Sequence, residues 1–374
     1  MLRFDEIITH QAHLRFLQSA VDRSAMPHAA LLWGPEGTGN LAAALAIAQY
    51  MVCADRSEQG PCGVCRGCVR SDKYLHPDIH FGFPTIGAKV TGDRLYPQWR
   101  TAISDNPHLN RQQWLERIDA ESKQGNINVE DINRMIGLMH LRSFEAGCKV
   151  LIIWMPEYLG KEGNRLLKLI EEPPADSYIF LVAENREELL PTILSRCQQF
   201  YFPVLREEMI RDGLIHHLKI ASERAGWIAA AAQGDWNTAL MLSQGKALNP
   251  VKWTQEWIKA AWSKDPGAIQ EWVDGASKHS REEAKQLLFY VLSVFQKVLW
   301  VKFGRTFPAS PEEKTTVSFL NTKIEQKELI WLTALCEENL RAIQQNASAR
   351  ILWYHLTLAF QKVLHATNAV RETA

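Results

Sequence analysis

The chain has 374 residues, of which 46% are hydrophobic and 22% charged, a composition typical of a folded protein of two or three domains. Lysine plus arginine and aspartate plus glutamate number 42 each, so the net charge gives no sign of a general nucleic-acid-binding surface. The N-terminal segment mixes charged with apolar residues, unlike a signal peptide, and no stretch approaches the roughly 18 apolar residues of a membrane span. We therefore expect a cytoplasmic protein without a membrane partner.

The first informative pattern is a glycine-rich stretch near the N-terminus. An apolar run, 29–33, enters the sequence GPEGTG, and an alanine-rich helical segment follows. This order is typical of a phosphate-binding loop, in which backbone N–H groups and a helix N-terminus hold phosphates. The lysine position of the pattern G-x-x-x-x-G-K-[ST] holds Asn40, however, and the Ser/Thr position holds Leu41. The loop is therefore degenerate, and its residues are Gly34, Gly37, Gly39, Asn40 and Leu41.

Four of the seven cysteines follow this helix with the spacing C-x8-C-x2-C-x2-C. Cysteines two residues apart can turn back on one ion, and the intervening glycines allow the tight backbone that a tetrahedral site requires. The alternative is four unpaired, reduced cysteines in a loop. The spacing favours one structural zinc per chain, held by Cys53, Cys62, Cys65 and Cys68. The remaining cysteines are isolated and are interpreted as small buried residues: Cys148, Cys197 and Cys336.

The next segment contains a predicted strand and then an irregular region. Residues 76–84 alternate as in a strand, and we interpret His76 and His80 as surface or core histidines, since the cysteines already complete a metal site. Residues 86–125 are polar, with prolines and scattered tryptophans (Trp99 and Trp114) and one possible helix at 111–122. We interpret 86–125 as a surface insertion without an assigned function.

Order returns with a helical pattern at 132–139 and a continuous apolar run at 150–154, which predicts a central parallel strand. In a phosphate-loop enzyme this strand ends in an acidic pair for Mg²⁺ and water activation. Here the two positions hold Trp154 and Met155. Glu157 follows, and we interpret it as a solvated glutamate at a helix start. The second half of a nucleotide site is therefore also missing.

The pattern continues with a helix at 163–171, a strand at 178–183, and a short helix and strand within 189–202. Asn185 could act as a γ-phosphate sensor, but a loop-capping asparagine is the preferred interpretation. Strands that alternate with helices predict a parallel α/β sheet covered on both faces.

Strand patterns end at residue 205, and the remainder is helical. We expect Trp253 and Trp257, at i and i+4, to pack helices together. The predicted domains are an α/β domain at 1–203, a helical lid at 204–247 and an all-helical domain at 248–374.

The sequence resembles the delta-prime family of bacterial DNA polymerase III subunits, within the AAA+ clamp loaders. The resemblance rests on five stretches: GPEGTGNL, the four-cysteine cluster, HPD at 76–78, NRLLKLIEEPP at 164–174, and LPTILSRCQ at 190–198. It covers about 1–247 by motif and the helical tail by architecture only. It implies an AAA+ α/β domain with an inserted zinc module, a helical lid, and an all-helical collar through which subunits associate.

The resemblance also implies a role. Asn237 stands where the family's lid carries a sensor arginine, a further loss that predicts neither hydrolysis nor tight binding of ATP. Arg196, in the SRC motif, is expected to act as an arginine finger in trans in a neighbouring motor subunit, and Ser195 to position the end of the preceding helix. The chain would then be a non-catalytic stator of the clamp loader. Its partners would be tau/gamma-type motor subunits and the delta subunit, and, through the complex, the sliding clamp and primer-template DNA.

Two other functions remain open from the residues alone. One is an AAA+ ATPase with an unorthodox site that uses Glu157 and Asn185. The other is a zinc-dependent nucleic-acid-binding module, which the balanced charge disfavours because phosphate binding draws on clustered Lys and Arg.

Overall fold

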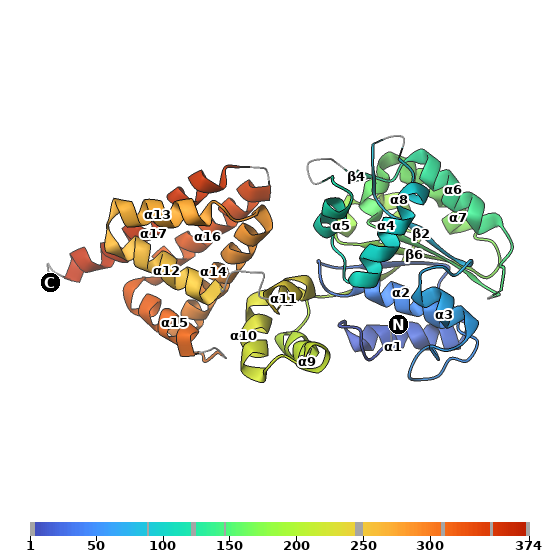
Figure 1. Cartoon of the computed structure of the whole chain (residues 1–374), viewed down its shortest axis with the longest axis horizontal. Coiled ribbons are helices and arrows are strands. Elements are labelled where there is room, and N and C mark those ends of the chain that lie inside the picture. The colour runs from blue at the N-terminus through green and yellow to red at the C-terminus, as the bar shows by residue number, and fades with distance from the viewer. Residues whose placement is uncertain are drawn as a thin grey trace. The chain divides into compact units, whose positions relative to one another are not determined.

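The computed structural model of the chain describes residues 4–87, 90–120, 125–145, 147–243, 250–307, 311–344 and 347–371. The chain divides into two compact units (Figure 1). The first comprises Met1–Ile210 and Gly234–Asn237, and the second Arg211–Gln233 and Thr238–Ala374. The first unit contains the predicted α/β domain. The boundaries of a separate lid and collar stay a prediction.

A five-stranded parallel sheet in the order β2-β5-β6-β1-β7 forms the centre of the first unit. Its strands are β1 (Ala29–Trp33), β2 (Ile79–Gly82), β5 (Lys149–Trp154), β6 (Ser177–Ala183) and β7 (Gln198–Tyr201). Neighbouring residues such as Leu151 and Ile152 belong to separate hydrophobic clusters, one on each face. Both faces are thus buried, which is why the strands read as continuous apolar runs. The predicted sheet, covered on both faces, is confirmed.

The first unit also contains helices, some of which cover the two faces of the sheet. They are α1 (Gln11–Asp22), α2 (Asn40–Met51), α3 (Arg66–Asp72), α4 (Gly92–Asp105), α5 (Arg111–Arg117), α6 (Val129–His140), η1 (Pro156–Leu166), α7 (Leu167–Glu171), η2 (Arg186–Glu188) and α8 (Pro191–Leu194). Residues of α2, α4 and α5 join one hydrophobic cluster, whereas residues of α6, η1 and α7 join the other. The helix predicted at 163–171 is in part the 3₁₀ segment η1, continued by α7.

Part of the region 86–125 packs in the core, so its predicted surface location is wrong, whereas its being an insertion stays a prediction. A short antiparallel pair, β3 (Thr85–Ile86) with β4 (Gly125–Asn126), closes it at its base. Its tryptophans, Trp99 and Trp114, have no exposed surface and lie in the main core. The sequence pattern did not indicate the burial of Trp99 and Trp114, because the two rings contact residues from other elements rather than a periodic partner on their own helix.

The described part of the second unit is helical (Figure 1). Its helices are α9 (Glu207–Leu218), α10 (Ser222–Ala232), α11 (Trp236–Ser243), α12 (Pro250–Ser263), α13 (Pro266–Ala276), α14 (Arg281–Lys302), α15 (Pro311–Lys323), α16 (Gln326–Gln344) and α17 (Ala349–Arg371), with α9 and α11 beginning in the first unit. Trp253 and Trp257 are buried and pack against Trp272 of α13, and Trp253 also packs against Trp353 of α17. The predicted packing role of these tryptophans is confirmed.

One stretch of α14, Glu283–Lys302, is long and apolar enough to cross a membrane by length and composition alone. However, 59% of it is buried within the structure, as expected for a central helix of a helical domain. No other stretch of the described residues passes this test.

Candidate functional site

The glycine loop joins β1 to α2 at the edge of the sheet where the parallel strands end. Gly37 and Gly39 have φ angles of +70° and +84°, which L-residues with side chains rarely adopt. A Cβ at Gly37 would lie only 1.8 Å from Oδ1 of Asp235. The loop therefore makes the predicted strand-to-helix turn, but another segment of the chain packs directly on it.

The side chains of Asn40 and Leu41, at the lysine and Ser/Thr positions of the loop pattern, are not available to bind phosphate or magnesium. The Nδ2 group of Asn40 donates to the carbonyl of Ala183 at the end of β6 (3.0 Å), and its Oδ1 accepts from the backbone N–H of Leu41 (2.8 Å). Leu41 is 2% exposed and belongs to the core. Asn40 thus holds the loop against β6, and Leu41 holds α2 against the sheet.

The end of β5 is equally apolar. Trp154 and Met155 are 3% and 2% exposed, and the Trp154 ring packs on Trp99, with ring centroids 4.9 Å apart. Register places this strand end beside β6, since Trp154 pairs with Val182. The position that carries magnesium-binding acids in phosphate-loop enzymes is therefore core here.

Glu157 begins η1 as predicted, but its predicted solvation is wrong. Its carboxylate accepts hydrogen bonds from the backbone N–H groups of Glu184 (2.7 Å) and Asn185 (2.9 Å), and burial raises its pKa. Asn185 caps η2, because its side chain accepts from the N–H of Glu187 (3.0 Å). Both residues suggested for an unorthodox site thus shape the loop after β6.

Acidic side chains gather at this edge. Burial, then repulsion by Glu36 and Glu157, raises the pKa of Glu184 well above its ordinary value, while Arg111 opposes the shift and Asp235 adds to it. Sequence reasoning missed this group because the sheet brings together residues that lie far apart in the chain. The side chains around the loop are thus mainly carboxyl groups, whereas phosphate binding requires cationic groups or free N–H donors.

Asn237, at the expected sensor position, lies in the first unit and is 3% exposed. Its Nδ2 donates to the carbonyl of His108 (2.6 Å), and its Oδ1 accepts from Nδ2 of Asn106 (2.8 Å). Asn237 therefore binds the loop between α4 and α5, in the region that the sequence left without a function.

Arg196 lies between α8 and β7, apart from the residues described so far. Its Nε pairs with the carboxylate of Glu171, and its Nη1 donates to the carbonyl of Thr192 (2.9 Å) and to Oγ of Ser195 (3.2 Å). The side chain remains 36% exposed. Sequence reasoning missed both the contact of Ser195 with Arg196 and the partner Glu171.

The four clustered cysteines converge. All four Sγ atoms lie within 4.8 Å of one another, with separations of 3.9 Å for Cys53–Cys65 and 4.0 Å for Cys62–Cys68. Four sulfurs around one tetrahedral zinc lie about 3.8 Å apart, given Zn–S bonds of about 2.3 Å. Backbone N–H groups also point at the sulfurs, for example that of Cys62 at Cys53 (3.3 Å). The cluster therefore fits a zinc ion, and among the described residues it is the one group of this kind.

The other three cysteines are also free thiols. Cys197 and Cys336 are buried, as interpreted, whereas Cys148 is half-buried.

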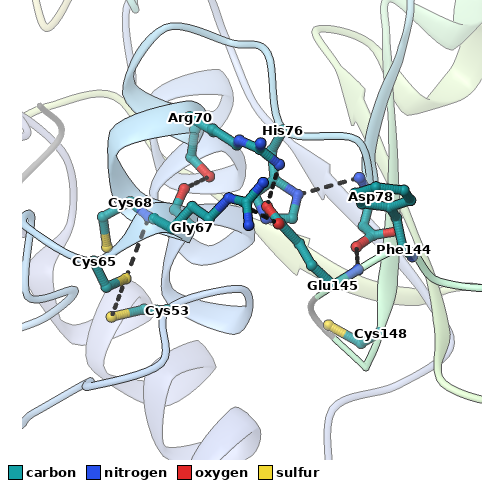
Figure 2. Close-up of polar contacts among 12 residues, drawn as sticks. Cys53, Cys65, Gly67, Cys68, Arg70, His76, Asp78, Phe144, Glu145 and Cys148 are labelled. Carbon is teal, nitrogen blue, oxygen red and sulfur yellow. Dashed lines mark hydrogen bonds and ion pairs between the residues drawn. The ribbon is translucent and has the colours of Figure 1, made fainter.

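A polar network links the cysteine module to the sheet (Figure 2). Glu145 pairs with Arg66 (3.4 Å) and Arg70 (2.8 Å) of α3 and faces Nε2 of buried His76 (3.5 Å). The Asp78 carboxylate accepts from the backbone N–H groups of Phe144 (2.6 Å) and Glu145 (2.9 Å). The HPD residues therefore hold the segment before β5 against the module, and His76 is a core histidine as interpreted.

The fold and site define a class: a parallel α/β protein with a degenerate phosphate-binding loop, which lacks the lysine and hydroxyl side chains of the full pattern. Residues 9–206 match the family described as "DNA polymerase III, delta subunit", which is more than half of the chain. The chain belongs to this family, and the resemblance seen in its motifs is confirmed.

Characterised relatives agree with this assignment. DNA polymerase III subunit delta' of Bacillus subtilis is 26% identical over 63% of this chain, and that of Escherichia coli is 27% identical over 59%. The chain spans 62% and 59% of the lengths of these relatives. Subunit tau of Escherichia coli is 26% identical over 64% of this chain and 32% of its own length.

Two solved structures cover most of the chain at low similarity. A gamma subunit-related protein of DNA polymerase III from Thermotoga maritima is 16% identical, covering 93% of this chain and 99% of its own, with a TM-score of 0.39. The Bacillus subtilis DNA clamp loader delta protein is 9% identical, covering 94% and 99%, with a TM-score of 0.32. At such TM-scores neither likeness adds to the family match.

Proposed function

We propose that the chain is the stator of a bacterial sliding-clamp loader: a subunit that does not hydrolyse ATP but completes the ATP site of a neighbouring motor subunit. That the chain does not hydrolyse ATP rests on one observation. The side chains of Leu41, Trp154 and Met155 are buried, each at most 3% exposed. These are the positions at which a phosphate-loop ATPase holds its magnesium and activates water. A core side chain cannot serve either purpose.

The electrostatics of the loop support the same conclusion. An ATPase places a lysine against the terminal phosphates, whereas Glu36 and Glu184 line the space beside this loop. A triphosphate would meet carboxylates there, and the one facing cation, Arg111, already interacts with Glu36 and Glu184, so like-charge repulsion disfavours binding. ATP is therefore not a ligand of this chain.

Arg196 is the group that the chain contributes to catalysis. Its guanidinium is partly exposed, and its hydrogen bonds to described residues use Nε and Nη1. A guanidinium has five N–H donors, so Nη2 can still face a γ-phosphate of another subunit. A residue of this kind acts only in trans, which gives a physical reason for a cationic group at this position in a chain with an inactive loop.

The cysteine module binds one structural zinc ion. Four thiolates leave no coordination position for water or substrate, so the ion braces the fold and takes no part in a reaction. Its network through Glu145 ties the module to the segment before β5.

The remaining parts of the function follow from the family. Residues 248–374 act as the collar that joins tau/gamma-type motor subunits and the delta subunit in a ring, and residues 204–247 form the lid. The ring opens the sliding clamp and places it on primer-template DNA in the cytoplasm.

The deciding experiment replaces Arg196 in the assembled loader. Arg196→Ala should leave assembly intact and lower the DNA-stimulated ATPase rate. Arg117→Ala is a matched control, because Arg117 is 35% exposed and paired with Asp105 much as Arg196 is paired with Glu171. An unchanged rate for Arg196→Ala would sink the finger assignment. ATP binding with Mg²⁺-dependent turnover by the isolated chain would instead overturn the inactive site.

A further inference from the structure

The helical segment 92–117, which has no counterpart in the proposed role, is anchored beside the glycine loop. Trp99 of α4 stacks on Phe83 (centroids 4.5 Å apart) and also contacts Trp154 and Trp114. The indole N–H of Trp114 donates to the carbonyl of Pro84 (2.8 Å). Aromatic pairs of this kind add to the free energy gained by burial, so α4 and α5 are fixed parts of the core.

The turn between these helices, residues 106–110, lies against the loop. His108, Leu109 and Asn110 line one small cavity together with Glu36, Gly37 and Asn40. The volume of this cavity is about 10 Å³, roughly the room for one water molecule. Pockets that hold a ligand of ordinary size are on the order of 300–1,000 Å³. The turn therefore fills the space in which a nucleotide would lie.

Residues 236 and 237 link this turn to the glycine loop. Its amide uses both its donor and its acceptor on the turn, through His108 and Asn106. The preceding residue, Trp236, donates its backbone N–H to the carbonyl of Gly37 (3.3 Å). The glycine loop, the turn 106–110 and residues 235–237 therefore each contact the other two segments, all within the first unit.

The turn also has a defined conformation of its own. Asn106 accepts from the N–H of His108 (3.0 Å), and Asn110 and Gln113 form a capping box at the start of α5. Burial lowers the pKa of His108 to about 4, so its ring is neutral and adds no charge near the loop. A turn held by its own hydrogen bonds loses little conformational entropy when it occupies the pocket.

We propose that residues 106–110 are an internal ligand of the former nucleotide pocket, which holds the glycine loop and the start of α11 in one arrangement at all times. The bridge is covalently part of the chain, so it cannot dissociate as a bound nucleotide can. The inference rests on the proposed function only in taking the loop to be inactive. Its consequence is a site whose conformation is independent of ATP and ADP, which suits a stator.

Hydrogen–deuterium exchange of the isolated full chain, with and without Mg²⁺-ATP, tests the proposal. In the unsubstituted chain the amides of 34–41 and 106–110 should already be protected, and ATP should change nothing. Asn237→Ala should raise exchange in both segments by about tenfold, the effect of losing buried hydrogen bonds worth on the order of 1.4 kcal/mol, and leave β5 and β6 unchanged. Asn106→Ala, which removes the partner amide, should act in the same way if Asn237→Ala fails to fold.

Asn128→Ala is the matched control. Asn128 is also a buried asparagine with two side-chain hydrogen bonds, to the N–H of Asp131 and to the carbonyl of Val90. Its loss should loosen the start of α6 but not 34–41. Unprotected loop amides in the unsubstituted chain, or variants at positions 237 and 106 that both leave 34–41 protected, would overturn the internal ligand alone. Protection of 34–41 by ATP would overturn both the internal ligand and the inactive site. Neither result bears on the proposed finger role of Arg196, which is tested separately in the assembled loader.

Discussion

The indole ring of Trp154, at the end of β5, packs against that of Trp99, from α4, with centroids 4.9 Å apart. One ring stands where a phosphate-loop enzyme carries an acid, and the other comes from the segment 92–117 that fills the adjoining space. The ring at the position of the lost acid therefore packs on the same segment that fills the pocket. Restoring the acid alone cannot restore the site, because a carboxylate at position 154 would face the ring of Trp99 in the core.

This packing predicts the effect of Trp154→Asp. The substitution removes a buried aromatic side chain and places a carboxylate in the core, which should lower the free energy of unfolding by about 3–5 kcal/mol. Trp154→Phe keeps an aromatic ring and should cost about 1–2 kcal/mol. Urea unfolding of the three proteins measures the differences. A Trp154→Asp protein as stable as the parent, or one that gains ATPase activity, would contradict the assignment of Trp154 to the core.

Glu184 gives a prediction about pH. Its pKa is raised in the folded chain by burial and by neighbouring carboxylates, so the folded state binds its proton more tightly than the unfolded state does. The contribution of Glu184 to stability therefore falls as pH rises from its unfolded pKa, about 4.3, through its raised folded value. Glu184→Gln removes the charge and should raise the melting temperature above that window, by an amount that shrinks toward low pH.

The charged groups around Glu184 and a control variant allow the result of this test to be interpreted. Glu36, Glu157, Asp235 and Arg111 remain unchanged in Glu184→Gln, so a pH-dependent gain reports the charge of Glu184. Glu187→Gln, at an exposed position in η2, should leave the melting curve almost unchanged. An equal shift for Glu184→Gln at every pH would indicate a change in packing rather than relief of charge.

The sequence predicted those parts of the fold that have a local signature. Runs such as 150–154 identify strands because both faces of the sheet are buried, and the cysteine spacing identifies the cluster because two-residue gaps return the chain to one ion. The turn at 106–110 carries no such signature. Its function depends on Asn237, 131 residues away from Asn106, and on strand register that brings Glu184 near the loop.

The resemblance to clamp-loader subunits identified Arg196 but not its surroundings. A family motif states which residue is present, whereas its partner Glu171 is given only by the way α7 and α8 pack together. The same holds for Glu145, which contacts the cysteine module through residues that no motif connects to it. Long-range polar contacts are thus the part of the site that one sequence cannot supply.

Zinc analysis tests the cysteine cluster. Freshly purified, reduced protein should contain one zinc per chain, and Cys62→Ser should contain none and melt several degrees lower, because zinc binding contributes directly to folding. Cys148→Ser is the matched control, since Cys148 is a half-buried free thiol outside the cluster. Zinc-free parent protein, or full zinc in Cys62→Ser, would reject the assignment.

Glu171 is predicted to position Arg196 for its proposed role. Its carboxylate pairs with Nε, which orients the guanidinium while Nη1 is held by Thr192 and Ser195. In the assembled loader Glu171→Gln should lower kcat at the site that Arg196 serves by up to about fivefold, since an exposed ion pair contributes at most about 1 kcal/mol, and leave KM for ATP unchanged. The loss should be smaller than that caused by Arg196→Ala.

A double substitution separates positioning from a general effect on the fold. If Glu171 acts through Arg196, adding Glu171→Gln to Arg196→Ala should cause no further loss of activity, because the group that it orients is already gone. Arg196→Lys should respond weakly to the change at Glu171, since a lysine ammonium lacks the planar fork that the carboxylate orients. Additive losses in the double variant would mean that Glu171 supports the loader in another way, even if Arg196 proves to be the finger.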